Sequence, residues 1–226
     1  MGFFELLSAN LPNFLAGLGM TIVVTLISLI LASIVGVLTC YCNLSRFRIL
    51  RIIGTCYVDI IRGTPLLVQA FFIYFGIPQG LGIRLSSDMA GIITMTLNAG
   101  AYLSEIFRSG IQAIDKGQME AARSLGLPAR NAMVKIIVPQ AFRIIIPSLV
   151  NQFIITLKDT SIMSAIGMRE LTQVGKLIVA VNFESFKTWA IVALLYLIPI
   201  TILSKLSKRL ERNLSYGSKG KRKKSA

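Results

Sequence analysis

The chain has 226 residues, of which 54% are hydrophobic and only 15% are charged. A soluble domain carries about 25% charged residues, and a helix crosses a bilayer with about 20 apolar residues, so several membrane spans are expected. The net charge of +14 would suggest nucleic acid in a soluble protein. Basic residues that flank spans set orientation and meet anionic lipid, so here we expect the bilayer and no nucleic acid as the partner. The absence of histidine excludes His-based catalysis and imidazole metal sites.

Hydropathy predicts an all-α membrane protein with five transmembrane spans. In chain order they cover about residues 12–41, 52–76, 88–107, 132–157 and 188–204. Residues 1–210 are therefore expected to form one transmembrane domain, followed by a basic cytoplasmic tail, residues 211–226. The sequence has no internal repeat and no GxxxxGK[ST] loop, so we expect no Walker A nucleotide site in this chain.

The Lys and Arg residues between the spans predict the orientation. The loops after the first and third spans hold, together with the tail, sixteen of them, whereas the loops after the second and fourth spans hold five. Because the richer side faces the cytoplasm, the N-terminus is expected outside and the C-terminus inside.

A short helix is predicted in the cytoplasmic loop after the third span, over residues 117–127 (GQMEAARSLGL). Gly126 and Pro128 are typical residues to end it, and Ala121 and Ala122 keep its surface small. Such a helix is suited to lie across the membrane plane and dock in a groove of another protein. The alternative is an interfacial helix that only joins two spans.

The spacing around this helix resembles the EAA signature of ATP-binding cassette importer permeases. The matching residues here are Glu120, Ala121, Ala122, Gly126, Ile136 and Pro139. Val138 stands where the family pattern has Leu, which is a mild departure.

Three further blocks are similar to the polar amino-acid uptake branch of that family, namely RGTPLLVQ, AYLSEIFRSGI and LKDTS. The resemblance covers roughly residues 12–206, nearly the whole chain. It implies a type I importer permease, a multi-pass protein of the bacterial cytoplasmic (inner) membrane. A second permease subunit, identical or similar, would complete the translocation path, and an extracytoplasmic solute-binding protein would serve it. Two cytoplasmic ATPase subunits would bind ATP and Mg, whereas this chain would bind no cofactor and catalyse no reaction.

The resemblance also implies that the EAA helix is the coupling helix, seated in a cleft of the ATPase. Glu120 would make a polar contact with that partner, and Ala121 and Ala122 would permit close approach. Gly126 would let the chain turn without a Cβ clash. Pro139 completes the signature and is expected to kink the fourth span.

Polar side chains in the third span predict a substrate site, because polar groups at membrane depth should face protein or water. Thr94, Asn98 and Tyr102 recur at helical spacing, and Glu105 follows three residues later. The alternative for the first three is hydrogen bonding between helices. For Glu105 the alternative is an ion pair with Arg108.

A second polar stripe is predicted in the fourth span, where Gln152, Thr156 and Asp159 share a helix face. Asp159, Thr160 and Ser161 are all N-cap types, so we expect the chain to break there and start a short helix. The free N–H groups of that helix would bind a substrate carboxylate, or Asp159 would bind a cationic group. The alternative is a cap with a neighbouring ion pair.

The second span adds Gln69, which lies seven residues beyond Arg62 on a similar face. Arg62 itself is expected to pair with Asp59. These donors and carboxylates together favour a polar, basic amino acid such as arginine, lysine or histidine as the substrate. The rival functions are a passive channel, a secondary transporter and a multi-span membrane enzyme. The enzyme is disfavoured because histidine is absent and the carboxylates are scattered.

Overall fold

The computed structural model describes residues 2–222, with side chains described for residues 2–210. The predicted basic tail, residues 211–226, therefore lies outside the residues whose side chains are described. In chain order the elements are α1 (Phe3–Asn43), α2 (Arg48–Gly63), α3 (Leu66–Phe71), η1 (Phe72–Gly76), α4 (Ile77–Leu81), α5 (Ser87–Gln112), α6 (Lys116–Ser124), α7 (Ala129–Ala132), η2 (Met133–Ile137), α8 (Val138–Asp159), η3 (Thr160–Ile166), α9 (Leu171–Asn182) and α10 (Ser185–Arg222). The described part of the chain is all-helical, as predicted.

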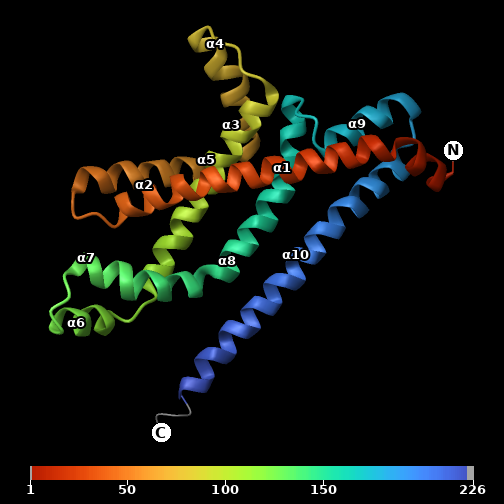
Figure 1. Cartoon of the computed structure of the whole chain (residues 1–226). Coiled ribbons are helices and arrows are strands. Elements are labelled where there is room, and N and C mark those ends of the chain that lie inside the picture. Colours follow the sequence, from red (N-terminus) through yellow and green to blue (C-terminus); the bar gives the residue numbers. More distant parts are fainter. Residues whose placement is uncertain (1, 223–226) are drawn as a thin grey trace.

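The bundle is built on α1 and α5, which form its most extensive helix pair (Figure 1). A Cβ atom on Gly36 would lie 2.9 Å from Leu103 Cβ, and one on Gly100 would lie 2.9 Å from Val35 Cγ1. Glycine at these two positions therefore lets the helices approach closely, as small residues do between membrane helices.

The second predicted span is not one straight helix. α2 and the segment Leu66–Leu81 meet at an angle of 106°; α3 packs against α5 and η3, whereas α4 projects from the bundle (Figure 1). The break falls at Thr64, whose backbone is extended (φ −121°, ψ 145°). Pro65 follows, and proline both disfavours helix in the residue before it and lacks an N–H group. The span predicted over residues 52–76 is therefore interrupted by a sharp bend.

Within the described part of the chain, three helical segments are long and apolar enough to cross a membrane, namely Phe3–Asn43, Ala129–Ile166 and Ser185–Leu210, and the bent pair would make a fourth. α5 has 26 residues, about 39 Å at 1.5 Å per residue, so its length also suffices. Its polar stripe makes it less apolar than the others. The count of five spans and the orientation stay predictions.

The chain does not break at Asp159, where a new helix was expected. α8 continues directly into the 3₁₀ helix η3, and the hydroxyls of Thr160 and Ser161 each donate to a backbone carbonyl of the preceding turn at 2.7 Å. The predicted N-cap is therefore wrong, because both hydroxyls bond backwards along the chain. The turn comes instead at Gly167 (φ 81°), and Glu170 then caps α9.

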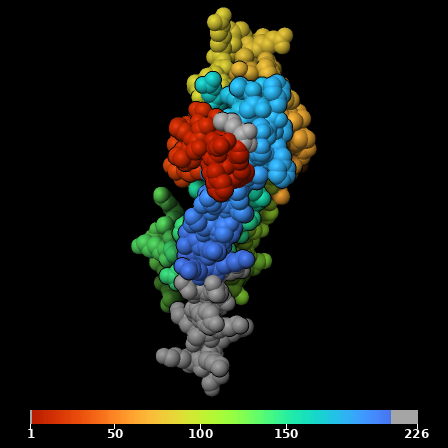
Figure 2. All heavy atoms as spheres, turned by 90° about the vertical axis from the view of Figure 1, so that its right-hand side faces the viewer, coloured from red at the N-terminus to blue at the C-terminus, as the bar shows by residue number. Residues whose placement is uncertain are grey.

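A buried polar cluster holds α9 between α1 and α10. Glu170 lies between the spanning segments and is fully buried; its carboxylate accepts the backbone N–H groups of Thr172 and Gln173 at 2.9 and 2.7 Å. The Tyr196 hydroxyl on α10 donates to the same carboxylate at 2.6 Å. Thr21 on α1 accepts a backbone N–H from the start of α9 at 3.2 Å. Burial raises the pKa of the Glu170 carboxyl, and its hydrogen-bond donors oppose that rise. Figure 2 shows the N-terminal part of α1 beside α9.

Candidate functional site

One side chain, Gln69, closes the bend between α2 and α3. Its Nε2 donates to the Ile61 carbonyl at 2.7 Å, and to the carbonyl and hydroxyl oxygens of Thr64 at 3.1 and 2.9 Å. In a continuous helix the Ile61 carbonyl would accept from the residue four positions on, which is Pro65 and has no N–H. Gln69 supplies the missing donor, and its side chain is buried in doing so.

The same side chain joins the bend to α5. Asn98 Nδ2 donates to Gln69 Oε1 at 3.1 Å. Further back along α2, the Tyr57 hydroxyl donates to the Leu97 carbonyl at 2.6 Å. Because both bonds connect segments that are distant in sequence, they fix the bent helix against the middle of α5.

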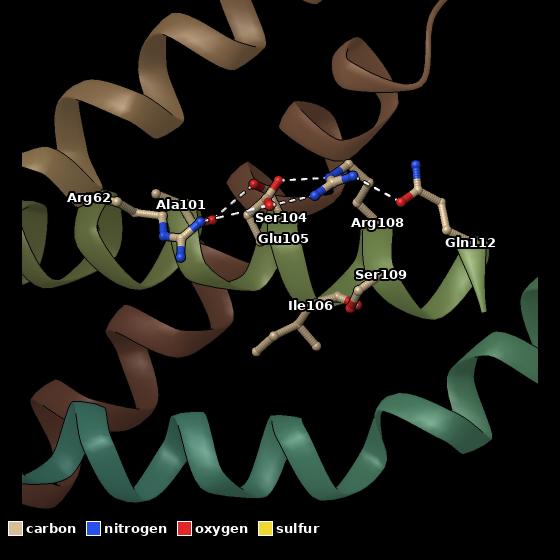
Figure 3. Close-up of polar contacts among 8 residues, drawn as sticks. All are labelled: Arg62, Ala101, Ser104, Glu105, Ile106, Arg108, Ser109 and Gln112. Carbon is tan, nitrogen blue, oxygen red and sulfur yellow. Dashed lines mark hydrogen bonds and ion pairs between the residues drawn. The ribbon is translucent and has the colours of Figure 1, made fainter.

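Arg62, close to the end of α2, faces two side chains of α5. Its Cζ lies 5.3 Å from the ring centroid of Tyr102, and its Nη1 lies 3.7 Å from Glu105 Oε2. Arg108 makes the closer pair with Glu105, with N–O distances of 2.9 and 2.7 Å. The Glu105 carboxylate therefore lies between two guanidinium groups (Figure 3). The Glu105–Arg108 ion pair, the alternative to a substrate contact for Glu105, is present, whereas Arg62 pairs with Glu105 and not with Asp59.

We refer to these side chains as the Glu105 cluster, which comprises Arg62, Gln69, Asn98, Tyr102, Glu105 and Arg108. A polar cavity of about 330 Å³ opens beside it. The cavity is lined by Asn43, Arg51, Thr55, Val58, Asp59, Arg62, Glu105, Arg108 and Gln112. Its volume lies in the range of small-molecule sites. Three guanidinium groups and two carboxylates line it. The cavity therefore offers a positive partner for the carboxylate of a zwitterion and a negative partner for its ammonium group.

Four of the seven predicted substrate-site residues belong to this cluster, and the other three lie outside it. Thr94 is fully buried, and its hydroxyl donates to a carbonyl of its own helix at 2.7 Å. Gln152 is also buried and bonds to Thr156, one turn along α8, at 3.3 Å. Asp159 is half-buried at the end of α8. Over residues 2–210, no hydrogen bond or ion pair joins these three to the Glu105 cluster.

Two members of the cluster, Arg62 and Arg108, were not placed in the site by the sequence, and Arg62 is the one that reaches it from another helix. The signal for it was its position three residues before Pro65. A side chain on the last turn before a break emerges where the chain changes direction, and such places often line cavities at membrane depth. Spacing alone could not show that Tyr102 and Glu105 lie opposite.

The predicted coupling helix forms as α6. Asp115 caps it, with its carboxylate accepting a backbone N–H at 2.7 Å. The helix ends before Gly126, whose φ of 81° lies in the left-handed region that glycine adopts without a Cβ penalty. Glu120 and Ala121 are exposed, but Ala122 is buried against its own chain. The free surface of the helix therefore contains Ala121 and not Ala122.

Pro139 lies in the first turn of α8, directly after the π-helical turn η2, and is exposed. Proline is tolerated in the first turn of a helix because it has no N–H to satisfy there. Its place in the structure is thus the start of α8.

The family model described as "Binding-protein-dependent transport system inner membrane component" matches residues 29–216. The arginine transport system permease protein ArtQ of Bacillus subtilis (strain 168) is 37% identical over 205 residues, covering 91% of this chain and 94% of ArtQ. The glutamine transport system permease protein GlnP of Escherichia coli (strain K12) is 36% identical over 205 residues, covering 90% of this chain and 94% of GlnP.

Chains of two solved ABC transporter structures have a similar fold. A chain from the crystal structure of an amino acid ABC transporter with histidines superposes with a TM-score of 0.89 at 36% identity, covering 94% of this chain and 99% of its own. A chain of the inward-facing MetNI methionine ABC transporter has a TM-score of 0.67 at 22% identity, covering 90% of this chain and 95% of its own. The second likeness shows a shared fold.

Proposed function

The chain belongs to the binding-protein-dependent transport system inner membrane components and is the permease subunit of an ABC amino-acid importer. From this premise we propose that it carries a basic amino acid past the Glu105 cluster. The observation that supports this most directly is the Glu105 carboxylate between two guanidinium groups, beside a polar cavity. Such a lining can bind the carboxylate and the ammonium of an amino acid together.

Arg62 is the group proposed to bind the substrate carboxylate. Its 3.7 Å distance to Glu105 is long beside the 2.7 Å of Arg108, and 45% of its side chain is exposed. A guanidinium presents several N–H donors in a planar fork, so Arg62 can bind a carboxylate bidentately while it stays over the Tyr102 ring. Gln69 and Asn98 hold the bend that positions it.

Two carboxylates support a cationic substrate side chain. Asp59 lines the cavity, Asp159 lies at the end of α8, and neither forms an ion pair within residues 2–210. Glutamine is the second candidate substrate, because the cavity lining itself carries one more guanidinium than carboxylate, which opposes an added positive charge. In both cases Gln152 would bind from α8 in another state of the cycle, and Thr94 would contribute by packing.

Coupling to ATP hydrolysis is proposed to run through α6. Family membership implies an ATPase partner and a binding protein; the ATPase would hold ATP and Mg, and this chain would hold neither. Glu120 and Ala121 are exposed on α6 and would dock in the ATPase cleft, with Gly126 setting the turn behind them. Closure of the ATPase pair would draw the α6 helices of the two permease subunits together. The helix α8, which begins near Pro139, would transmit this motion as a rigid element to the translocation path.

The assembly in this proposal contains two permease subunits, identical or similar, in the bacterial cytoplasmic membrane. The N-terminus lies outside, the binding protein docks on that side, and the basic tail lies in the cytoplasm. The Lys and Arg distribution supports this orientation.

The test is uptake by the purified permease–ATPase complex in proteoliposomes with its binding protein. We expect ATP-dependent uptake of labelled arginine, competed by lysine and histidine more strongly than by glutamate. Stronger competition by glutamine would select the second candidate, and equal transport of glutamate and arginine would reject both. Flux through the permease without the ATPase would instead indicate a channel or a secondary transporter.

A further inference from the structure

A second, separate cavity lies on a different part of the molecule from the Glu105 cluster. It is an apolar groove of about 810 Å³ between the C-terminal end of α1, the C-terminal end of α5 and the η2–α8 segment. Its walls include the side chains of Val37, Tyr41, Phe107, Val134 and Phe142. Several of these are among the exposed large apolar residues, so the chain by itself leaves this groove open.

One end of the groove carries positive charge. Of the described residues that line it, Arg46 alone is charged. Its Cζ lies 5.3 Å from the ring centroid of the neighbouring Phe47, which also lines the groove, so the guanidinium is held at the mouth. Lys135 and Arg143 directly follow two other lining residues in the chain and are exposed. No acidic residue lines the groove or adjoins a lining residue in sequence.

An apolar groove with a cation at its mouth complements an amphiphile that has an anionic head and an apolar tail. Anionic phospholipids have this chemistry, and they give the cytoplasmic leaflet its negative surface potential. A protein occupant would need both an acidic group and a long apolar side-chain row in register, whereas a phospholipid carries both in one molecule.

We infer that the groove between α1, α5 and α8 is a binding site for one anionic phospholipid, with its acyl chains between Val37, Val134 and Phe142 and its phosphate at Arg46. The orientation proposed above puts this mouth at the cytoplasmic leaflet. The lipid site itself stands on the groove and its charge, independently of the transported substrate. A bound lipid here would fill the space between α1 and the start of α8, next to the segment that follows α6.

The test is native mass spectrometry of the purified permease–ATPase complex with added phosphatidylglycerol or phosphatidylcholine. We expect one phosphatidylglycerol retained per permease in preference to phosphatidylcholine. Arg46→Gln should weaken phosphatidylglycerol retention roughly fivefold, the effect of one basic residue near an anionic lipid head. Arg48→Gln, which changes a basic residue two positions away that begins α2 and does not line the groove, should leave retention unchanged.

A second pair of variants tests the groove itself. Val37→Trp should fill it and abolish retention, whereas Ile30→Trp, two helical turns away on the same exposed face of α1, should not. Equal retention of the two lipids, or equal behaviour of both tryptophan variants, would overturn the inference. Loss of the permease pair in Val37→Trp alone would also overturn it, because a second permease copy would then cover the groove. Arg46→Gln keeps the test valid if Val37→Trp fails to insert.

Discussion

Asn98 on α5 donates a hydrogen bond to Gln69 on α3, with 3.1 Å between Nδ2 and Oε1, across 29 positions of sequence. The nitrogen of the same Gln69 side chain satisfies the Ile61 carbonyl that Pro65 leaves without a donor. One glutamine thus closes the bend and ties it to α5. Any movement that opens the bend must therefore break a contact with the helix that carries Tyr102 and Glu105.

Gln69→Leu tests whether this side chain holds the bend. Leucine has a similar size but cannot donate, so the part-buried carbonyls at the bend would lose their partner, at a cost of about 1 kcal/mol. We expect a lower thermal midpoint for the purified complex and reduced uptake. Gln79→Leu, at an exposed position in α4, is the matched control. Identical midpoints for the two variants would contradict the role of Gln69.

Arg62→Lys tests recognition of the substrate carboxylate. Lysine keeps the positive charge but loses the planar fork and the stacking on Tyr102. We expect the KM for the transported amino acid to rise roughly tenfold with a smaller change in the maximal rate, because a binding contact is lost. Initial uptake rates over a range of substrate concentrations measure this. An unchanged KM would remove Arg62 from the binding site.

Gly126→Asp tests coupling through α6. Gly126 has a φ of 81° and nothing within 4 Å of an added Cβ, so the cost is backbone strain of about 1–2 kcal/mol, which aspartate tolerates better than most residues. We expect insertion and ATPase activity to persist while uptake per ATP falls. The matched control is Gly82→Asp, which has a φ of 66° and the same open surroundings but lies in the loop before α5. Normal uptake by Gly126→Asp, or an equal loss in Gly82→Asp, would argue against a coupling role.

Glu170→Ala tests the cluster that joins α1, α9 and α10. The substitution removes the N-cap of α9 and the acceptor of the Tyr196 hydroxyl, so we expect a loss of about 2 kcal/mol. Tyr196→Phe removes only one hydrogen bond and should cost less. Thermal midpoints of both variants in the same detergent check the order. A larger effect of Tyr196→Phe would show that Glu170 is not the centre of the cluster.

The sequence alone predicted the features that depend on neighbouring residues. The all-helical class follows from long apolar runs, and α6 with its glycine turn follows from capping and propensity near Gly126. The Glu105–Arg108 pair was predictable because three residues along a helix bring two side chains together. In each case the determining contacts are local in the chain.

Some local predictions failed because two local rules competed. Thr160 and Ser161 are good N-cap residues, yet their hydroxyls bond to the preceding turn and the helix continues into η3. The run of residues 52–76 is apolar enough for a span, yet Pro65 bends it by 106°. Hydropathy measures composition over a window and does not register one missing N–H group.

Only the tertiary structure decided which polar residues meet. Thr94 and Asn98 lie on one face of α5 by spacing, but Thr94 is enclosed by the bundle while Asn98 reaches Gln69 across the bend. Arg62 faces Glu105, and Glu170 meets Tyr196, because the angle and register between helices bring them there. Those two quantities depend on packing over the whole bundle, where close contacts such as Gly36 against Leu103 set how near the helices lie.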